Sequence, residues 1–160
     1  MGIDMGFLST LKNHYQSQMK RNHNRPFLKG AMAACALVAI ADREVSFSQR
    51  VRVDQIMETL DALKVFDPHD GIDLFNEFVD AIRKCPKGGR DQAYEAIMAV
   101  AVTDETKELL LRICLAVSEA DGEKHLADQI EIVMLCSLLG IDPRNCGLYV
   151  DKTAEEILSA

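Results

Sequence analysis

Two stretches of the chain carry the same pattern at a separation of 79 residues: Cys35-Ala-Leu-Val-Ala-Ile-Ala-Asp42-Arg43-Glu44 and Cys114-Leu-Ala-Val-Ser-Glu-Ala-Asp121-Gly122-Glu123. In each copy an apolar helical stretch runs into an acidic turn, and a second amphipathic stretch follows the turn. A duplication of this kind predicts two helical hairpins related by a pseudo-twofold axis. Two copies are too few for a solenoid, so we expect both hairpins to belong to one compact bundle.

Helical spacing extends outward from the two copies over nearly the whole chain, because apolar residues recur three and four positions apart. We therefore predict an all-α fold, a compact bundle of about seven helices that contains the two pseudo-symmetric helix-turn-helix repeats. No segment shows the alternation typical of a strand. The length of 160 residues fits a single domain. We divide it into a basic N-terminal helix or arm (1–24), a core (25–148) and a C-terminal tail (149–160).

The ends of several expected helices are marked by local signals. Ser46 and Gln49 have the spacing of a capping box at the start of the third helix, and Thr103 or Asp104 caps the sixth. Residues 67–71 indicate a turn, so the fourth helix is expected from about residue 72 and the fifth from about residue 91. The third helix is expected to bury Val53, Ile56, Met57, Leu60 and Leu63, and the seventh to bury Leu126, Ile130, Val133, Met134 and Leu138.

Charge is unevenly distributed along the chain. The formal net charge is -7, from 18 basic and 25 acidic residues, which argues against a protein that binds nucleic acid over its whole surface. Residues 1–30 nevertheless hold five basic residues and one acidic residue. This basic arm is expected to lie on the chain's own acidic body, on anionic lipid or on a partner.

The sequence indicates neither a targeting signal nor a membrane span. Lys12, Asn13 and His14 interrupt the N-terminal apolar stretch, which argues against a signal peptide. No apolar run approaches the roughly 20 residues that a membrane-spanning helix needs. Five cysteines without a C-x-x-C pair favour free thiols in a reducing compartment. We therefore predict a cytoplasmic protein, either free or peripheral to the inner membrane.

The two copies and their flanks resemble a known family. The family pattern is a small-residue helix, then A-D-G-x-(apolar)-(S/T)-x-x-E, then a second amphipathic helix, and both copies follow it with departures. Together with Asn24-Arg25-Pro26-Phe27-Leu28-Lys29-Gly30 and Leu63-Lys64-Val65-Phe66-Asp67, it is similar to the tellurite-resistance protein B (TerB) family over roughly residues 25–148. A related module forms the N-terminal cytoplasmic part of a membrane-anchored DnaJ-type co-chaperone. The resemblance implies an all-helical domain, a role in tellurium-oxyanion or general stress resistance, and an acidic surface expected to bind metal cations.

The resemblance places candidate metal ligands at the two turns. Carried over position by position, they are Asp42, Glu44, Asp121, Glu123 and Asp128. The first turn departs most from the family pattern, because Arg43 replaces a glycine and Gln49 replaces the glutamate at the helix start. The implied cofactor is a divalent cation (Ca²⁺, Mg²⁺ or Mn²⁺), since hard cations take oxygen ligands, with no organic cofactor. The second turn is the better candidate site.

The same carboxylates also have a structural explanation, which the sequence leaves open. Asp121 can cap the preceding turn, and Asp128 falls in a first helical turn, where negative charge is favoured by about 0.3–1 kcal/mol. The spacing is not that of an EF-hand, because Ile132 stands where the bidentate glutamate would be. A second cluster is open to the same two interpretations, a metal site or a capped turn: Asp67, His69, Asp70 and Asp73.

The sequence contains no motif that indicates catalysis. It has no G-x-S-x-G, no H-E-x-x-H and no glycine-rich phosphate loop, and Cys35, Cys114 and Cys136 lie on apolar helical faces. We predict a non-enzymatic tellurite-resistance or stress-response protein that binds divalent cations or a protein partner through its acidic surface. The expected partners are proteins of a tellurite- or stress-resistance complex, including one at the inner surface of the membrane. The alternatives are a cysteine-dependent redox enzyme acting on tellurite and a membrane-surface scaffold similar to the co-chaperone module.

Overall fold

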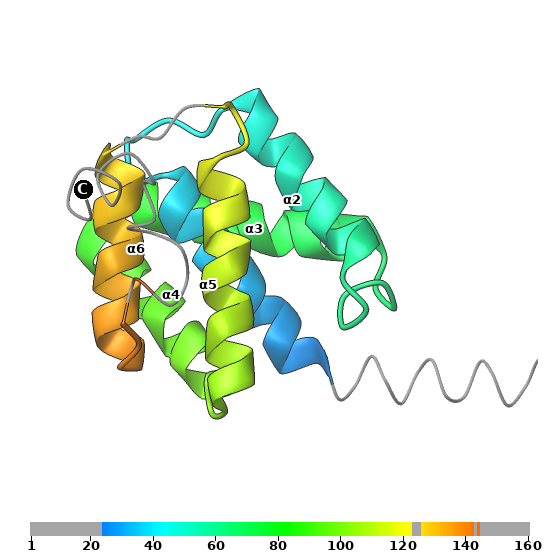
Figure 1. The fold of residues 1–160 in the computed structure, drawn as a ribbon. Coiled ribbons are helices and arrows are strands. Elements are labelled where there is room, and N and C mark those ends of the chain that lie inside the picture. The colour runs from blue at the N-terminus through cyan, green and yellow to red at the C-terminus, as the bar shows by residue number, and fades with distance from the viewer. Residues whose placement is uncertain (1–23, 123–125, 143, 145–160) are drawn as a thin grey trace, which may run out of the picture.

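A computed structural model describes residues 24–122, 126–142 and 144, and all regular structure within those residues is helical (Figure 1). The helices comprise residues 24–39, α2 (Phe47–Thr59), α3 (Pro68–Lys84), α4 (Pro86–Val100), α5 (Asp104–Ser118) and α6 (Leu126–Leu139). The predicted all-α class is confirmed. The expected first helix, around residues 7–19, and the tail over 149–160 lie outside the described residues.

The helix over residues 24–39, called the central helix below, is enclosed by the other helices. Every residue from 30 to 40 is buried, and this blue helix passes behind α5 in the middle of the bundle (Figure 1). A helix can be covered on all sides because it lacks a polar face, and residues 31–40 include no charged or amide side chain. A Cβ on Gly30 would lie 2.6 Å from Val100 Cγ2, so glycine at this position lets α4 approach closely.

The remaining helices pack in neighbouring pairs around the central helix. The α3–α4 pair is the most extensive, α2 packs on both α3 and α5, and α5 packs on α6. Arg50 joins α2 to α3: its Nη1 donates to Asn76 Oδ1 at 2.7 Å, and its guanidinium lies 5.7 Å from the centre of the Phe75 ring. The two acidic turns connect the central helix to α2 and α5 to α6.

The predicted starts of α2 and α5 are confirmed by their hydrogen bonds. The backbone N–H of Gln49 donates to Ser46 Oγ at 3.1 Å, and the N–H of Ser46 donates to Gln49 Oε1 at 3.0 Å, which completes the capping box. The side chain of Thr103 accepts from the N–H of Thr106 at 3.2 Å and so caps α5.

Two helices begin earlier than the turn residues suggested. Asp67, expected inside a turn, caps α3, because its carboxylate accepts the backbone N–H two residues later at 2.9 Å. Pro68 follows it as the first residue of α3, and Pro86 likewise begins α4. Proline fits the first helical position because it lacks an N–H that would be unpaired there in any case. The starts expected near residues 72 and 91 were therefore wrong.

The buried face expected for α6 was also wrong. The side chains expected inside are exposed: Leu126 by 71%, Ile130 by 51%, Met134 by 47% and Leu138 by 44%. The buried set is Asp128, Glu131, Ile132, Leu135, Cys136 and Leu139. Because α6 has apolar residues on two faces, its periodicity cannot decide which face turns inward. The buried face of α6 is instead decided by tertiary contacts: its packing against α5, and the hydrogen bonds that Glu131 accepts from α4.

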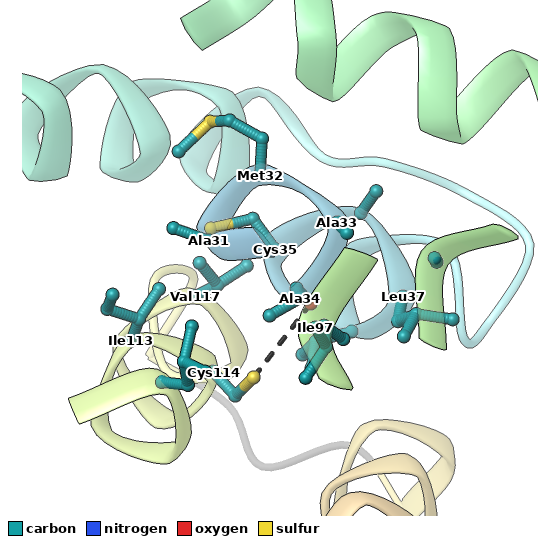
Figure 2. Packing of buried hydrophobic residues seen from close by; sticks show 14 of the residues in the cluster. Ala31, Met32, Ala33, Ala34, Cys35, Leu37, Ile97, Ile113, Cys114 and Val117 are labelled. Atoms are coloured by element: carbon teal, nitrogen blue, oxygen red, sulfur yellow. Dashed lines mark hydrogen bonds between the residues drawn. The ribbon is translucent and has the colours of Figure 1, made fainter. Parts of the chain in front are cut away.

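The buried positions of the first hairpin recur in the second at the same separation of 79 residues. The matching pairs are Gln49/Asp128, Val53/Ile132, Ile56/Leu135 and Met57/Cys136 in α2 and α6, and Met32/Leu111, Cys35/Cys114 and Val38/Val117 in the central helix and α5. Figure 2 shows α5 side chains packed against the central helix, with Cys114 Sγ directed at the carbonyl oxygen of Ala34, 3.9 Å away. The two predicted helix-turn-helix repeats are therefore present.

Candidate functional site

The two acidic turns have the same backbone structure. Arg43 and Gly122, 79 residues apart, both occupy the left-handed region, with φ of 75° and 79°. The N–H of Arg43 donates to the carbonyl of Ile40 at 2.8 Å, and the N–H of Gly122 donates to that of Glu119 at 3.0 Å. Two residues earlier in each turn, a second equivalent bond measures 3.2 Å: the N–H of Ala41 donates to the carbonyl of Val38, and that of Ala120 to the carbonyl of Val117. The duplication therefore extends to the hydrogen bonds that close each helix.

The first turn presents two exposed carboxylates beside a cation. Asp42, Arg43 and Glu44 are all exposed, and Asp42 Oδ1 accepts the backbone N–H of Glu44 at 3.1 Å. That bond is an Asx turn, in which an aspartate stabilises its own loop. One oxygen of Asp42 is therefore engaged in holding the turn, and the charge of Arg43 partly offsets the two carboxylates.

The second turn lacks the arginine. Asp121 and Gly122 are exposed, while the candidate ligand Glu123 and the neighbouring His125 lie outside the described residues. The segments that hold the two turns lie at the same end of the bundle, next to the beginnings of α2 and α6 (Figure 1). This end of the molecule, called the acidic end below, is defined by Asp42, Glu44 and Asp121.

Asp128 does not lie on the surface of the acidic end. It is fully buried in the first turn of α6 and occupies the place of Gln49, which is 2% exposed in α2. Gln49 belongs to a helix cap, so the repeat gives Asp128 the same position at a helix start. The five candidate ligands thus divide into three exposed carboxylates, one buried carboxylate, and one residue that the structure does not describe.

Among the described residues, no three His, Cys, Asp or Glu side chains are grouped closely enough to hold a metal ion. This finding includes the second cluster proposed from the sequence, around His69. There, Asp67 serves as the cap of α3 through its bond to the N–H of His69. A metal at the second acidic turn would therefore need oxygen donors beyond the described side chains, with Glu123 as the first candidate.

A partly buried ionic cluster that the sequence did not predict joins α4 to α6. Arg90 Nη2 donates to both carboxylate oxygens of Glu131, at 2.9 and 2.7 Å, and Tyr94 Oη donates to Glu131 Oε1 at 2.8 Å. Burial raises the pKa of Tyr94 to about 12, and the hydrogen bond to Glu131 adds to the shift. Burial lowers the pKa of Arg90, but its bonds to Glu131 and the charge of that carboxylate outweigh burial and raise it overall.

No sequence motif marks this cluster, because its members are 37 and 41 residues apart. The available signal was the i, i+4 spacing of Arg90 and Tyr94, which places them on one face of α4. The cluster buries Glu131, 4% exposed, with its charge fully engaged by two donors. The cluster therefore has a structural role, because it holds α4 and α6 together through hydrogen bonds and an ion pair.

The described cysteines are mostly inaccessible. Cys35, Cys114 and Cys136 are buried, and Cys85 is exposed. Burial raises the pKa of the Cys35 thiol to about 12, so a negligible fraction is thiolate at neutral pH. Cys146, the fifth cysteine, lies outside the described residues.

Comparison with known proteins connects this architecture to one family. A family model described as "Tellurite resistance protein TerB" matches residues 29–149, a range that contains both repeats and both acidic turns. A curated protein named "Tellurium resistance protein TerB", from Alcaligenes sp., is 28% identical over 108 residues, covering 68% of this chain and 88% of the relative. No solved structure is significantly similar to the chain. Among the described residues, no helix is both long and apolar enough to cross a membrane.

Proposed function

The chain belongs to the TerB family of tellurite-resistance proteins, and from this premise we propose that it is a non-enzymatic cytoplasmic member whose acidic end binds a cationic ligand. One observation carries the proposal: two turns with the same backbone present exposed carboxylates at the same end of the bundle. Clustered like charges repel one another, and a bound cation would relieve that repulsion. The curated relative's name links it to tellurium resistance, and we extend that role to this chain.

The specific ligand we propose is a divalent cation at the second turn. Asp121 is exposed there, and Gly122 stands where the first turn carries Arg43. The second turn therefore combines a carboxylate with a flexible backbone and has no side-chain cation at the position of Arg43. The ligands would be Asp121 and Glu123, completed by water or backbone oxygens, as Ca²⁺ and Mn²⁺ accept. We exclude Asp128 from the proposed ligands because its side chain is buried.

Calorimetric titration of the full chain with Ca²⁺ and Mn²⁺, together with melting curves, tests this proposal. At ten times Kd, binding to the native state stabilises by about 1.4 kcal/mol, roughly 3 °C for a chain of this size. We expect this shift in the wild type, its loss in Asp121→Asn and its retention in Asp42→Asn. The two variants remove one charge each from equivalent positions, so they are matched controls. An absent shift, or equal loss in both variants, would contradict the metal site.

A basic protein partner is the second candidate ligand. It is favoured by the absence of a three-ligand group among the described residues, since a broad cationic surface needs no convergent ligands. Such a partner would belong to a tellurite- or stress-resistance complex, in the cytoplasm or at the inner surface of the membrane. Binding that weakens steeply with added salt and is reduced by both Asp42→Asn and Asp121→Asn would separate it from the metal site.

The burial of three cysteines argues against the redox alternative. A cysteine that reduces an oxyanion must be accessible and must form a thiolate readily. Cys35 meets neither condition, because it is fully buried and its pKa is raised to about 12. Among the described cysteines, Cys85 alone is exposed, and it stands between α3 and α4 as a helix cap residue.

A further inference from the structure

The polarity of α6 is inverted for a helix at the surface of a bundle. Its two charged residues, Asp128 and Glu131, are both buried. Its outer face carries Leu126, Ile130, Met134 and Leu138 at intervals of four residues, exposed by 71%, 51%, 47% and 44%. A surface helix ordinarily directs polar residues outward, and a contiguous exposed apolar stripe marks a docking surface. We call these four residues the α6 stripe.

The α6 stripe is not simply inherited from the repeat. The equivalent positions of α2 are Phe47, Val51, Gln55 and Thr59, so the outer face of α2 becomes polar in its second half. Charged residues also flank that face of α2, whereas the exposed residues of α6 include none. The outer face of the second repeat is therefore apolar along its whole length, whereas that of the first is apolar only in its first half.

The α6 helix ends in a left-handed turn directly after the stripe. Gly140 adopts φ of 71°, and the N–H of Ile141 donates back to the carbonyl of Cys136 at 2.9 Å. This is the six-to-one bond of a helix C-terminal turn, after which the chain departs from the helix axis. The part of the chain that follows, residues 145–160, therefore begins at the end of α6 where the stripe finishes.

The turn that follows α6 resembles the one that starts α3, although the two are 75 residues apart and so lie outside the 79-residue register of the repeat. The carboxylate of Asp142 accepts the N–H of Arg144 at 3.0 Å, just as that of Asp67 accepts the N–H of His69 at 2.9 Å. In both places a proline follows the aspartate. The first Asp-Pro cap opens α3, which packs against α2. The similar bond at Asp142 is therefore a helix start signal, placed directly after a helix whose outer face is apolar and exposed.

We propose that residues 145–160 form an amphipathic helix that docks on the α6 stripe. Their apolar residues follow helical spacing, with Val150, Ala154, Ile157 and Leu158 at positions i, i+4, i+7 and i+8. Three acidic residues, Asp151, Glu155 and Glu156, fall between them and would face solvent. Sixteen helical residues extend about 24 Å, enough to run back along the 14-residue α6. This inference is independent of the acidic end and of its ligand.

A tryptophan reporter tests the proposal in the full chain, because the natural sequence contains no tryptophan. In Ile157→Trp, we expect blue-shifted emission and weak quenching by acrylamide, as for a buried indole. Adding Ile130→Asp places a charge in the stripe and should shift the emission to that of an exposed indole. The matched control is Val51→Asp at the equivalent position of α2, which should leave the emission unchanged. Circular dichroism establishes that each variant keeps its helices.

Three results would overturn the proposal, and two of them name another occupant. Solvent-like emission from Ile157→Trp, or equal responses to Ile130→Asp and Val51→Asp, would show that the tail does not cover α6. A Phe7→Trp reporter that responds to Ile130→Asp, while Ile157→Trp does not, would assign the stripe to the N-terminal arm. Emission that shifts with protein concentration, together with a dimer mass that Ile130→Asp abolishes, would assign it to a second copy of the chain.

Discussion

At the scale of single residues, the duplication is clearest at Arg43 and Gly122. Both hold the same left-handed backbone, yet arginine adopts it at a cost of about 1–2 kcal/mol and glycine at almost none. The first turn keeps this strained conformation because Arg43 must be left-handed for its N–H to bond the carbonyl of Ile40 and so close the central helix. The substitution therefore added a positive charge to the first turn without changing its shape.

Substitutions at these two positions, Arg43→Gly and Gly122→Ala, should change the free energy of unfolding in opposite directions. Arg43→Gly relieves the left-handed strain but makes the unfolded chain more flexible, so we expect a net gain of about 0.5–1 kcal/mol. Gly122→Ala should lose about 1 kcal/mol through backbone strain alone, because a Cβ there would meet no atom within 4 Å. Urea unfolding measures both changes. Stabilisation by Gly122→Ala would show that the second turn does not need the conformation of the first.

At the scale of elements, the crossing of α3 and α4 depends on one glycine. A Cβ on Gly89 would lie 2.5 Å from the backbone of Ala81 and Ile82, atoms that cannot move without shifting α3. At the neighbouring Gly88, the nearest atom would be the side-chain sulfur of Cys85, at 3.3 Å. The two glycines lie in the same first turn of α4 but face different surroundings.

The two glycines therefore make a matched pair of substitutions. Gly89→Ala should destabilise by about 1–3 kcal/mol, because overpacking a helix crossing forces the backbones apart. Gly88→Ala should be neutral or stabilising by up to about 1 kcal/mol, since alanine favours the helix and the cysteine side chain can move aside. Thermal unfolding followed by circular dichroism compares them. Equal effects at both positions would mean that the close approach at Gly89 does not limit the packing of α3 on α4.

The α6 helix shows why one element cannot always be interpreted by itself. It has apolar residues on two faces, and its own periodicity selected the wrong one. The repeat contained the correct answer: adding 79 to Val53, Ile56 and Met57, which are buried in α2 as predicted, gives Ile132, Leu135 and Cys136. Alignment of a repeat therefore carries burial information that periodicity within one helix lacks.

At the scale of the whole molecule, the cluster of Arg90, Tyr94 and Glu131 ties α4, which lies between the repeats, to the second repeat. The cluster also makes stability depend on alkaline pH. The pKa of Tyr94 rises from 10.0 to about 12 on folding, so the native state retains this proton where the unfolded chain loses it. Its stabilising contribution is therefore complete below about pH 10 and is lost as the pH rises toward 12.

Tyr94→Phe should remove this part of the pH dependence. At neutral pH the variant should lose about 1 kcal/mol, because one donor to the buried Glu131 is missing. Between about pH 10 and pH 12 the wild type should lose stability more steeply than the variant, so the difference in the free energy of unfolding narrows. Unfolding free energies at a series of pH values measure both slopes. Parallel slopes would show that folding does not shift the pKa of Tyr94.

The sequence alone determined the helical class, the caps at Ser46 and Thr103, the duplication and the inward face of α2, because each depends on residues close together in the chain. It also placed the acidic residues at equivalent turns. Only the tertiary structure decided that Asp128 and Glu131 are buried while the α6 stripe is exposed. Burying a carboxylate is favourable only where donors compensate for lost water. For Glu131 those donors come from α4, about 40 residues away, and no local pattern can supply them.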